Sequence, residues 1–363
     1  MKVNKGIKKM DKREGILIVS VTIFVLSLVG TASATNWSVD GSGGADFSGI
    51  QEAINKASVG DTIIVHSGVY YENVVVNKSV TLKGIGYPVV DAGGEENAIM
   101  LCADGITLVG FIVTNSGSLW NNAAGIKVTS NSNNISCNNA SNNWEGIVLR
   151  ESSNNTITGN DAGNNYMYGI CLDHSSNNTI TGNNVNNNNW YGICIDFSSN
   201  INTISGNTVS NNNEGIIIWN SSSNTIKGNT VSNNDRSGIY LHWAASSNII
   251  TGNTVSNNNW NGIRIWFSNN NKIYLNNIVG NDDNVYSLDA NNIWHSPQEI
   301  AYSYDGNAYR NYLGNYWADY AGRADADGIG NTPYSIDSKS DESDDYPLMQ
   351  PFENYNIPTS AHS

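Results

Sequence analysis

The stretch from Gly146 to Phe267 repeats one sequence pattern, and this repeat limits the possible fold more than any other feature. Five copies, the first reading GIVLRESSNNTITGN, open 23 residues apart with a Gly-Ile pair, at Gly146, Gly169, Gly192, Gly215 and Gly238. A sixth copy opens 24 residues later, at Gly262. Self-similarity at a fixed period in the twenties is typical of a solenoid, in which each turn is one repeat.

The order of apolar residues within a copy indicates which solenoid forms. Apolar positions alternate with others, as Ile170, Leu172 and Ile180 show. This is the period of strands, and no run has the spacing of an amphipathic helix. Three short strands per copy predict a parallel β-helix of about ten turns, each about 4.8 Å above the last. The crossover rule for parallel strands makes it right-handed.

Asparagine and glycine mark the corners between the predicted strands. A Gly-Asn pair recurs at the same place in successive copies, at 159–160, 182–183, 206–207, 228–229 and 252–253. Glycine and asparagine adopt left-handed backbone angles at low cost, which a tight corner requires. Asparagines stacked at one corner can also bond to one another through their amides. We therefore expect the asparagine content to be structural.

Residues 1–34 have the three parts of a secretory signal peptide. A basic region from Lys2 to Arg13 precedes an apolar run from Ile16 to Val29 and the motif Ala32-Ser33-Ala34. We expect the protein to be secreted to the cell surface or beyond. The alternative is an uncleaved segment that anchors the chain in a membrane.

The chain without this segment is strongly acidic. It would have 12 basic and 30 acidic residues, a net charge of −18 instead of −14. Such a surface repels nucleic acid, so we exclude that partner class. Export as a glycoprotein agrees with the Asn-x-Ser/Thr acceptors at Asn36, Asn77, Asn134, Asn139, Asn154, Asn177 and Asn220.

The segment after the signal predicts a short helix that caps the first turn. Ser48 and Gln51 form a capping box ahead of the apolar residues Ile50, Ala53 and Ile54. A helix here would cover the core and strand edges that the first turn exposes. The motifs DFSGIQEA, GDTI and YYEN resemble the opening of the pectin-lyase-like superfamily of β-helices.

The repeat stops at about residue 290, and the composition then changes. The segments LGNYWADYAGRADADGIGNTPYSID and DDYPLMQPFENY resemble the closing motif of NosD-type β-helix proteins. That family, named for copper delivery, contains periplasmic and surface proteins and is frequent in methanogenic archaea. The resemblance spans residues 36–355 and implies an exported right-handed parallel β-helix. We divide the chain into a signal peptide (1–34), a β-helix (35–290, regular over 125–288) and a C-terminal cap (291–363).

The closing segment also contains a candidate metal site. Asp325, Asp327 and Asn331 surround Gly328 and Gly330, and oxygen ligands at this spacing suit Ca²⁺. The alternative is a polar turn without a metal. Copper has little support, because the soft ligands that could gather on one surface are few: Cys171, Cys194, His174 and His242.

One face of the predicted β-helix collects nearly all the reactive side chains. Residues that alternate with the inward Ile and Leu of the first strand point outward and align from turn to turn. This face is rich in aromatic side chains, whose flat apolar rings can stack on sugars. We predict that it binds polysaccharide through Trp190, Tyr191, Trp219, Tyr240, Trp243, Arg264 and Trp266. The alternative is that the rings only cover the sheet or pack against another protein.

The same face carries a pair of carboxylates. Asp173 and Asp196 are predicted to lie about 5 Å apart on successive turns, with Arg150 and His174 beside them. Such proximity raises one pKa and places an acid next to an anion, which suits proton removal from a uronate. The run YGICLDH with Asp196 resembles the Tyr-Gly-x-Asp-Pro-His motif of alginate C5-epimerases, without its proline. The alternative is a pair of solvated carboxylates.

Three functions remain open from the sequence. The first is an exported surface protein that binds polysaccharide along the aromatic and acidic face. The second is a polysaccharide lyase or uronate C5-epimerase that uses Asp173, Asp196, His174 and Arg150 as catalytic residues. The third is a structural module of the cell envelope or an adhesion module.

Overall fold

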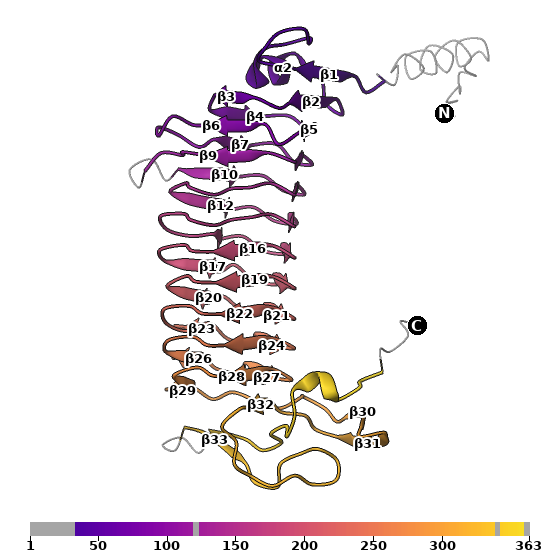
Figure 1. Ribbon diagram of the computed structural model, residues 1–363, viewed down its shortest axis with the longest axis vertical. Helices are drawn as coiled ribbons and strands as arrows, with labels where there is room; N and C mark the ends of the chain where they lie inside the picture. The colour runs from indigo at the N-terminus through magenta and orange to yellow at the C-terminus, as the bar shows by residue number, and fades with distance from the viewer. Residues whose placement is uncertain (1–32, 119–122, 338–341, 359–363) are drawn as a thin grey trace, which may run out of the picture.

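The protein is a right-handed parallel β-helix, as the repeat predicted, and it is described here from a computed structural model. The structure describes residues 33–118, 123–337 and 342–358. Figure 1 shows the stacked turns as a rod, with the N-terminal segment at one end and an irregular C-terminal region at the other. Within these residues the sheets of the rod are parallel, and the largest has 11 strands, close to the ten turns expected.

Sheet 1 forms the wall on which the predicted site lies. Its ten described strands are β4 (Val74–Val76), β7 (Ile99–Leu101), β10 (Ala124–Val128), β12 (Glu145–Arg150), β14 (Ile170–Asp173), β17 (Tyr191–Asp196), β20 (Glu214–Trp219), β23 (Ile239–His242), β26 (Asn261–Trp266) and β29 (Asp283–Leu288).

Sheet 2 follows sheet 1 in each turn. Its strands are β1 (Asn36–Val39), β2 (Thr62–His66), β5 (Thr81–Ile85), β8 (Thr107–Val109), β11 (Asn134–Ser136), β13 (Thr156–Thr158), β15 (Thr179–Thr181), β18 (Thr203–Ser205), β21 (Thr225–Lys227), β24 (Ile249–Thr251) and β27 (Lys272–Tyr274).

Sheet 3 closes each turn and is divided into two parts. Three strands lie near the N-terminal end, β3 (Val69–Tyr71), β6 (Val89–Asp91) and β9 (Ile112–Thr114). Six more follow, β16 (Asn184–Asn186), β19 (Thr208–Ser210), β22 (Thr230–Ser232), β25 (Thr254–Ser256), β28 (Asn277–Val279) and β32 (Tyr316–Trp317).

The core of the rod is filled by one or two apolar side chains from each strand. Ile193 and Ile195 of β17, Ile204 of β18 and Val209 of β19 have no exposed surface. In β18 and β19 the flanking residues are more exposed, so the burial pattern there has the period of two that the sequence indicated. Burial of a Val or Ile side chain contributes about 1.5–3 kcal/mol relative to an exposed one.

Asparagines form three hydrogen-bonded columns, one at each corner of the rod. In each column an Nδ2 donates to the Oδ1 of the asparagine one turn on, at 2.8–3.2 Å. The Gly-Asn pairs supply the column between sheets 2 and 3, and their glycines have φ of 62–65°. The predicted structural role of these asparagines is confirmed. The columns contain Asn133, Asn155, Asn178, Asn202, Asn224, Asn248, Asn271 and Asn292; Asn138, Asn160, Asn183, Asn207, Asn229, Asn253, Asn276 and Asn315; and Asn165, Asn188, Asn212, Asn234, Asn258 and Asn281.

The predicted N-terminal helix exists, but its capping box is wrong. Helix α2 spans Ile50–Lys56, its N-cap residue is Gly49, and no side chain of the cap bonds to it. The carboxylate of Glu72 accepts from the backbone N–H groups of Ile50 and Gln51 instead, both at 2.8 Å. A side chain from the next turn therefore satisfies the donors that Ser48 was expected to bond. The helix lies at the N-terminal end of the stack (Figure 1), and its capping role stays a prediction.

The stacking continues into the region expected to be an irregular cap. Strand β32 pairs with β28, and Asn315 extends the column that begins at Asn138. The region also contains two antiparallel pairs and a short 3-10 helix: β30 (Ile300–Tyr304) with β31 (Asn307–Asn311), β33 (Tyr334–Asp337) with β34 (Glu342–Asp344), and η2 (Phe352–Asn354).

The asparagine columns generate a prediction about stability. Asn207, 1% exposed, donates to Asn229 and to the carbonyl of Ile180, and accepts from Asn183. We expect Asn207→Ala to lower the free energy of unfolding by roughly 3 kcal/mol, because it leaves several buried polar groups without partners. Urea denaturation followed by circular dichroism measures this change.

The matched control is Asn259→Ala, at an exposed position two turns further along the rod. We expect it to change the free energy of unfolding by less than about 0.5 kcal/mol. Equal effects of the two substitutions would contradict the view that the buried columns stabilise the rod.

Candidate functional site

The candidate site is built on the outer surface of sheet 1. Strand pairing places Asp173 opposite Asp196 of the next turn. In the same way it places Trp219 opposite His242, and His242 opposite Trp266. Equivalent residues of successive copies therefore lie directly above one another, as the repeat predicted. Because strands alternate, these side chains leave the core while Leu172 and Ile195 enter it.

The residues between the two inward side chains of each sheet 1 strand, here called the first outward column, point away from the core but are buried. Its members Val148, Cys171, Cys194, Ile217 and Tyr240 are 2–7% exposed and form an apolar cluster separate from the core. Tyr168, Tyr191 and Trp266 pack over this cluster. Large rings from the edges of the wall thus cover its middle, which the strand period alone does not reveal. The two cysteines are free thiols.

A ladder of aromatic rings runs along sheet 1, formed by the last residue of a strand or by the residue that follows it. The ring centroids of Phe197 and Trp219 are 6.0 Å apart, those of Trp219 and His242 are 4.8 Å apart, and those of His242 and Trp266 are 5.2 Å apart. Phe197 has a φ of 41°, an unfavourable backbone conformation for a bulky residue. The same slot has a positive φ in other copies, 49° at His174 and 46° at Trp243, so the turn after the strand keeps one backbone conformation along the wall.

A groove with a volume of about 520 Å³ opens on this wall over strands β17 to β26. Six of the seven predicted binding residues line it. The seventh, Trp243, lies at the strand end, is 59% exposed, and contacts Phe267 edge to face. The residues that line the groove are Asn189, Trp190, Tyr191, Asn213, Glu214, Ile217, Trp219, Arg236, Tyr240, His242, Trp260, Arg264 and Trp266.

The prediction missed several groove residues, and Arg236 is the most informative. Arg236 stands two residues before the Gly of its copy, in the slot that holds Trp190 and Trp260 in other copies. Alignment of the copies on glycine could have found it. Two guanidinium groups contact the ring of Trp260, with distances from the guanidinium carbon to the ring centre of 5.5 Å for Arg236 and 4.6 Å for Arg264.

Glu214 supplies a carboxylate at the floor of the groove. It is 2% exposed, and its Oε2 accepts from the backbone N–H of Ser237 at 2.8 Å. Burial raises its pKa, and Arg264 and Arg236 partly oppose this shift. Burial, together with the charge of Arg264, lowers the pKa of His242 on the same wall.

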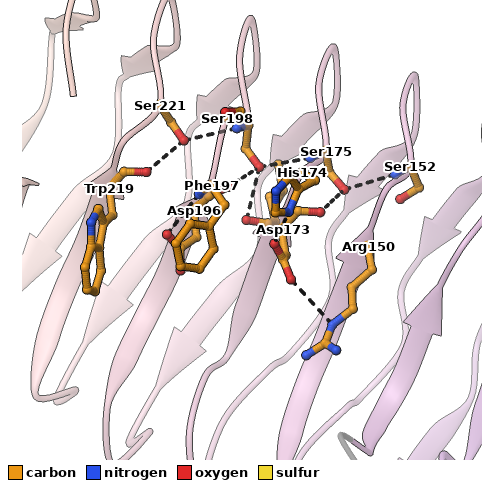
Figure 2. A network of polar contacts seen from close by, with 12 residues as sticks. Arg150, Ser152, Asp173, His174, Ser175, Asp196, Phe197, Ser198, Trp219 and Ser221 are labelled. Carbon is orange, nitrogen blue, oxygen red and sulfur yellow. Dashed lines mark hydrogen bonds and ion pairs between the residues drawn. The ribbon is translucent and has the colours of Figure 1, made fainter. Parts of the chain in front are cut away.

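The predicted catalytic residues lie together at the edge of the groove. Figure 2 shows Arg150, Asp173, His174 and Asp196 at the ends of β12, β14 and β17. His174 Nδ1 is 2.6 Å from Asp173 Oδ1, and Arg150 Nε is 3.8 Å from Asp173 Oδ2. At the corner next to this cluster, serine hydroxyls accept hydrogen bonds from the backbone of the preceding turn, as Ser175 Oγ does from Ser152 N–H.

The two carboxylates of this cluster have different partners. Asp173 contacts Arg150 and His174, whereas the side chain of Asp196 accepts from the backbone N–H of Phe197 at 2.9 Å. Burial raises the pKa of Asp196 to about 6, and the charge of Asp173 adds to this effect. An acid near neutral pH therefore stands beside a paired carboxylate, an arrangement able to exchange protons.

The candidate calcium ligands lie in one loop of the C-terminal region, and their oxygens have internal partners. Asp327 accepts from the side chain of Asn311 at 3.0 Å and from Ile329 N–H at 3.1 Å, and Asn331 Oδ1 accepts from Arg323 N–H at 3.1 Å. Asp325 lies in the same loop, where Gly328 N–H donates to its carbonyl. Calcium binding by Asp325, Asp327 and Asn331 stays a prediction.

Comparison with protein families identifies the repeat. The family model described as periplasmic copper-binding protein (NosD) matches residues 167–322, and the model for a right handed beta helix region matches 68–231. The β-helix repeat is therefore of the NosD type over residues 167–322. Copper does not fit the wall, since no group of three or more His, Cys, Asp or Glu residues that could hold a metal occurs in the described part of the chain.

A curated relative shares a segment of this chain. It is a cell surface glycoprotein of Methanothermus fervidus, 32% identical over 127 residues. The segment is 34% of this chain and 21% of the glycoprotein, so the match spans about a fifth of the length of that relative.

Solved structures share the fold at low sequence identity. The A-module of the Azotobacter vinelandii mannuronan C-5 epimerase has a TM-score of 0.57 and 15% identity, over 66% of this chain and 73% of that one. The lacto-N-biosidase of Eubacterium ramulus has a TM-score of 0.51 and 12% identity, over 77% and 70%. The Dettilon tailspike protein has a TM-score of 0.50 and 17% identity, over 67% and 63%.

The predicted signal peptide lies almost wholly outside the described residues, which begin at residue 33. In the described ranges, no helix has the length and apolar character needed to cross a membrane. Cleavage of the signal and anchoring by it therefore stay alternatives.

The raised pKa of Asp196 predicts how stability depends on pH. A carboxyl group with a raised folded pKa contributes its stability at low pH and loses it as pH rises through about 6. We expect Asp196→Asn, which stays neutral, to unfold roughly 1–2 °C above wild type at pH 8, after solvent screening is allowed for. The difference should shrink at pH 4. Thermal unfolding at both pH values measures it, and a variant equally shifted at pH 4 and pH 8 would contradict the assignment.

Proposed function

We propose that this protein is exported to the cell surface and binds polysaccharide along the outer wall of sheet 1. The observation that carries the proposal is the groove over β17 to β26, which four tryptophans line: Trp190, Trp219, Trp260 and Trp266. Sugar rings have an apolar face that stacks on such side chains. Exposed aromatic residues gathered in one groove are typical of a binding site and not of a plain surface.

The shape of the groove supports a chain-like ligand. Its lining residues come from four successive turns, which at about 4.8 Å per turn gives a length of about 14 Å along the rod. Polar groups alternate with the rings: Asn189, Asn213 and His242 can bond sugar hydroxyls. A polymer laid parallel to the rod axis would meet rings and polar groups in turn.

The comparisons support a carbohydrate partner and a place at the cell surface. Two proteins with the same fold are named for carbohydrate substrates, the mannuronan epimerase and the lacto-N-biosidase. The relative from Methanothermus fervidus is named as a cell surface glycoprotein, and the family model as a periplasmic protein. A polysaccharide or envelope glycan is therefore the partner class we propose.

A glycan array tests the proposal. The full-length chain should bind a subset of the glycans, and the double variant Trp219→Ala with Trp266→Ala should lose at least tenfold in affinity, because stacking on an aromatic ring contributes about 0.5–1.5 kcal/mol beyond its buried area. Tyr71→Ala is the matched control, since Tyr71 is a 78% exposed ring of sheet 3. Asp173→Asn should also keep the binding.

The array can reject this function. Absence of any glycan hit for the wild-type chain would favour the structural or adhesion module. Hits that survive the double tryptophan substitution would place binding away from the groove.

A second candidate function is a polysaccharide lyase or uronate C5-epimerase at the edge of the groove. Its support is the pairing of Asp196, with a pKa of about 6, with Asp173 and His174. One group could take the proton next to the uronate carboxylate while Arg150 bonds that carboxylate.

Incubation with polyuronates in deuterated buffer tests this chemistry. A lyase would produce the ultraviolet absorbance of unsaturated uronates, and an epimerase would incorporate deuterium at C5. We expect Asp196→Asn to reduce either signal by at least 100-fold, whereas Trp243→Ala, outside the groove, should keep it. No signal from the wild-type chain, together with glycan binding, would leave binding alone as the function.

A further inference from the structure

Two arginines in the groove form no ion pair with a carboxylate of the described residues. The sequence contains six arginines in an acidic chain, and Arg236 and Arg264 both line this one groove. Among the described residues, the arginine ion pairs within 4.0 Å are Arg150 with Asp173 and Arg310 with Glu299. The groove therefore concentrates two guanidinium groups that form no direct ion pair within the described part of the chain.

Aromatic rings fix the position of these guanidinium groups. The carbon of the Arg264 guanidinium is 4.6 Å from the ring centres of Tyr240 and Trp260 and 5.6 Å from that of Trp266. Such contacts use the face of the guanidinium and the ring and leave the N–H groups, which lie in the guanidinium plane, to other acceptors. Arg236 shares Trp260 from a centroid distance of 5.5 Å.

The remaining polar groups of the groove do not remove this charge. Glu214 is the one carboxylate among the lining residues, so two guanidinium groups face a single acid, and its Oε2 already accepts from Ser237 N–H. Trp266 adds a donor, because its buried Nε1–H has no acceptor in the described part of the chain. The groove thus has two guanidinium groups and one carboxylate among its lining side chains.

We infer that the groove selects sugars that carry an oxyanion, either the carboxylate of a uronate or a sulfate ester, over neutral sugars. This inference rests on the proposed polysaccharide binding and names the class of polymer. The planar fork of a guanidinium bonds two oxygens of a carboxylate or sulfate at once, and the low exposure around Tyr240 strengthens that bond. The aromatic rings stack on the sugar while Arg236 and Arg264 bind its charged substituent.

Affinity gel electrophoresis of the full-length chain tests the inference with three polymers: polygalacturonate, dextran sulfate and neutral dextran, in 150 mM NaCl as a working condition of about physiological ionic strength. We expect retardation by a charged polymer and little by dextran. Arg264→Gln should weaken that binding about tenfold, and Arg264→Lys, which keeps the charge but loses the fork, should weaken it less. Arg236→Gln should also weaken it.

Arg310→Gln is the matched control, because Arg310 is an exposed arginine outside the groove. It should leave retardation unchanged, which separates the groove from general attraction to polyanions. Circular dichroism checks that each variant is folded. Retardation by polygalacturonate alone would identify a carboxylate ligand, by dextran sulfate alone a sulfate ligand, and by both the shared oxyanion chemistry.

Two results would overturn the inference. In the first, dextran retards the chain as strongly as the charged polymers do, and Arg264→Gln has no effect. The groove then binds polysaccharide without distinguishing charged from neutral sugars, and the proposed function still stands. If none of the three polymers binds, the inference is wrong, and the glycan array then decides separately whether the proposed function stands.

Discussion

The hydrogen bonds between asparagine amides one turn apart are the interaction on which the rest of the structure depends. Each Nδ2 and its backbone N–H reach the same Oδ1 in the next turn, as Asn183 does with Asn207. A buried amide without these partners would cost about 1–3 kcal/mol, so a slip of one residue anywhere in a column would be penalised at every corner. This constraint fixes the register of all three sheets and therefore the vertical alignment of the residues on the outer wall.

Register alone explains why the wall can hold a site. Equivalent positions become columns, so substitutions in single copies set the local chemistry without disturbing the fold. Cys194, Ile217 and Tyr240 fill one column as an apolar floor, while Asp196 and Trp219 stand in the next. The wall is consequently divided along its length, with the carboxylates toward β14 and β17 and the arginines toward β23 and β26. Binding and proton exchange, if both occur, would be separate functions of neighbouring turns.

Much of the fold was predictable from the sequence because solenoid contacts repeat at a constant interval. The period, the alternation of Ile and polar residues, and the recurring Gly-Asn pairs predicted the strands, the corners and the pairing of Asp173 with Asp196. The helix cap was not predictable in the same way, since Glu72 reaches the start of α2 from a different turn. Local sequence favoured Ser48, but the tertiary contact supplied a charged acceptor with two oxygens.

The sequence by itself determined the right-handed parallel β-helix and the wall that carries the aromatic and charged residues, because both follow from spacing along the chain. Only the tertiary structure decided how that wall is shaped. Large rings fold across the first outward column, bury it, and leave a groove between them that Trp243 does not reach. The tertiary structure also brings the guanidinium groups of Arg236 and Arg264 against the same ring, that of Trp260. These arrangements depend on side-chain directions and sizes in adjacent turns, which the period of the repeat does not encode.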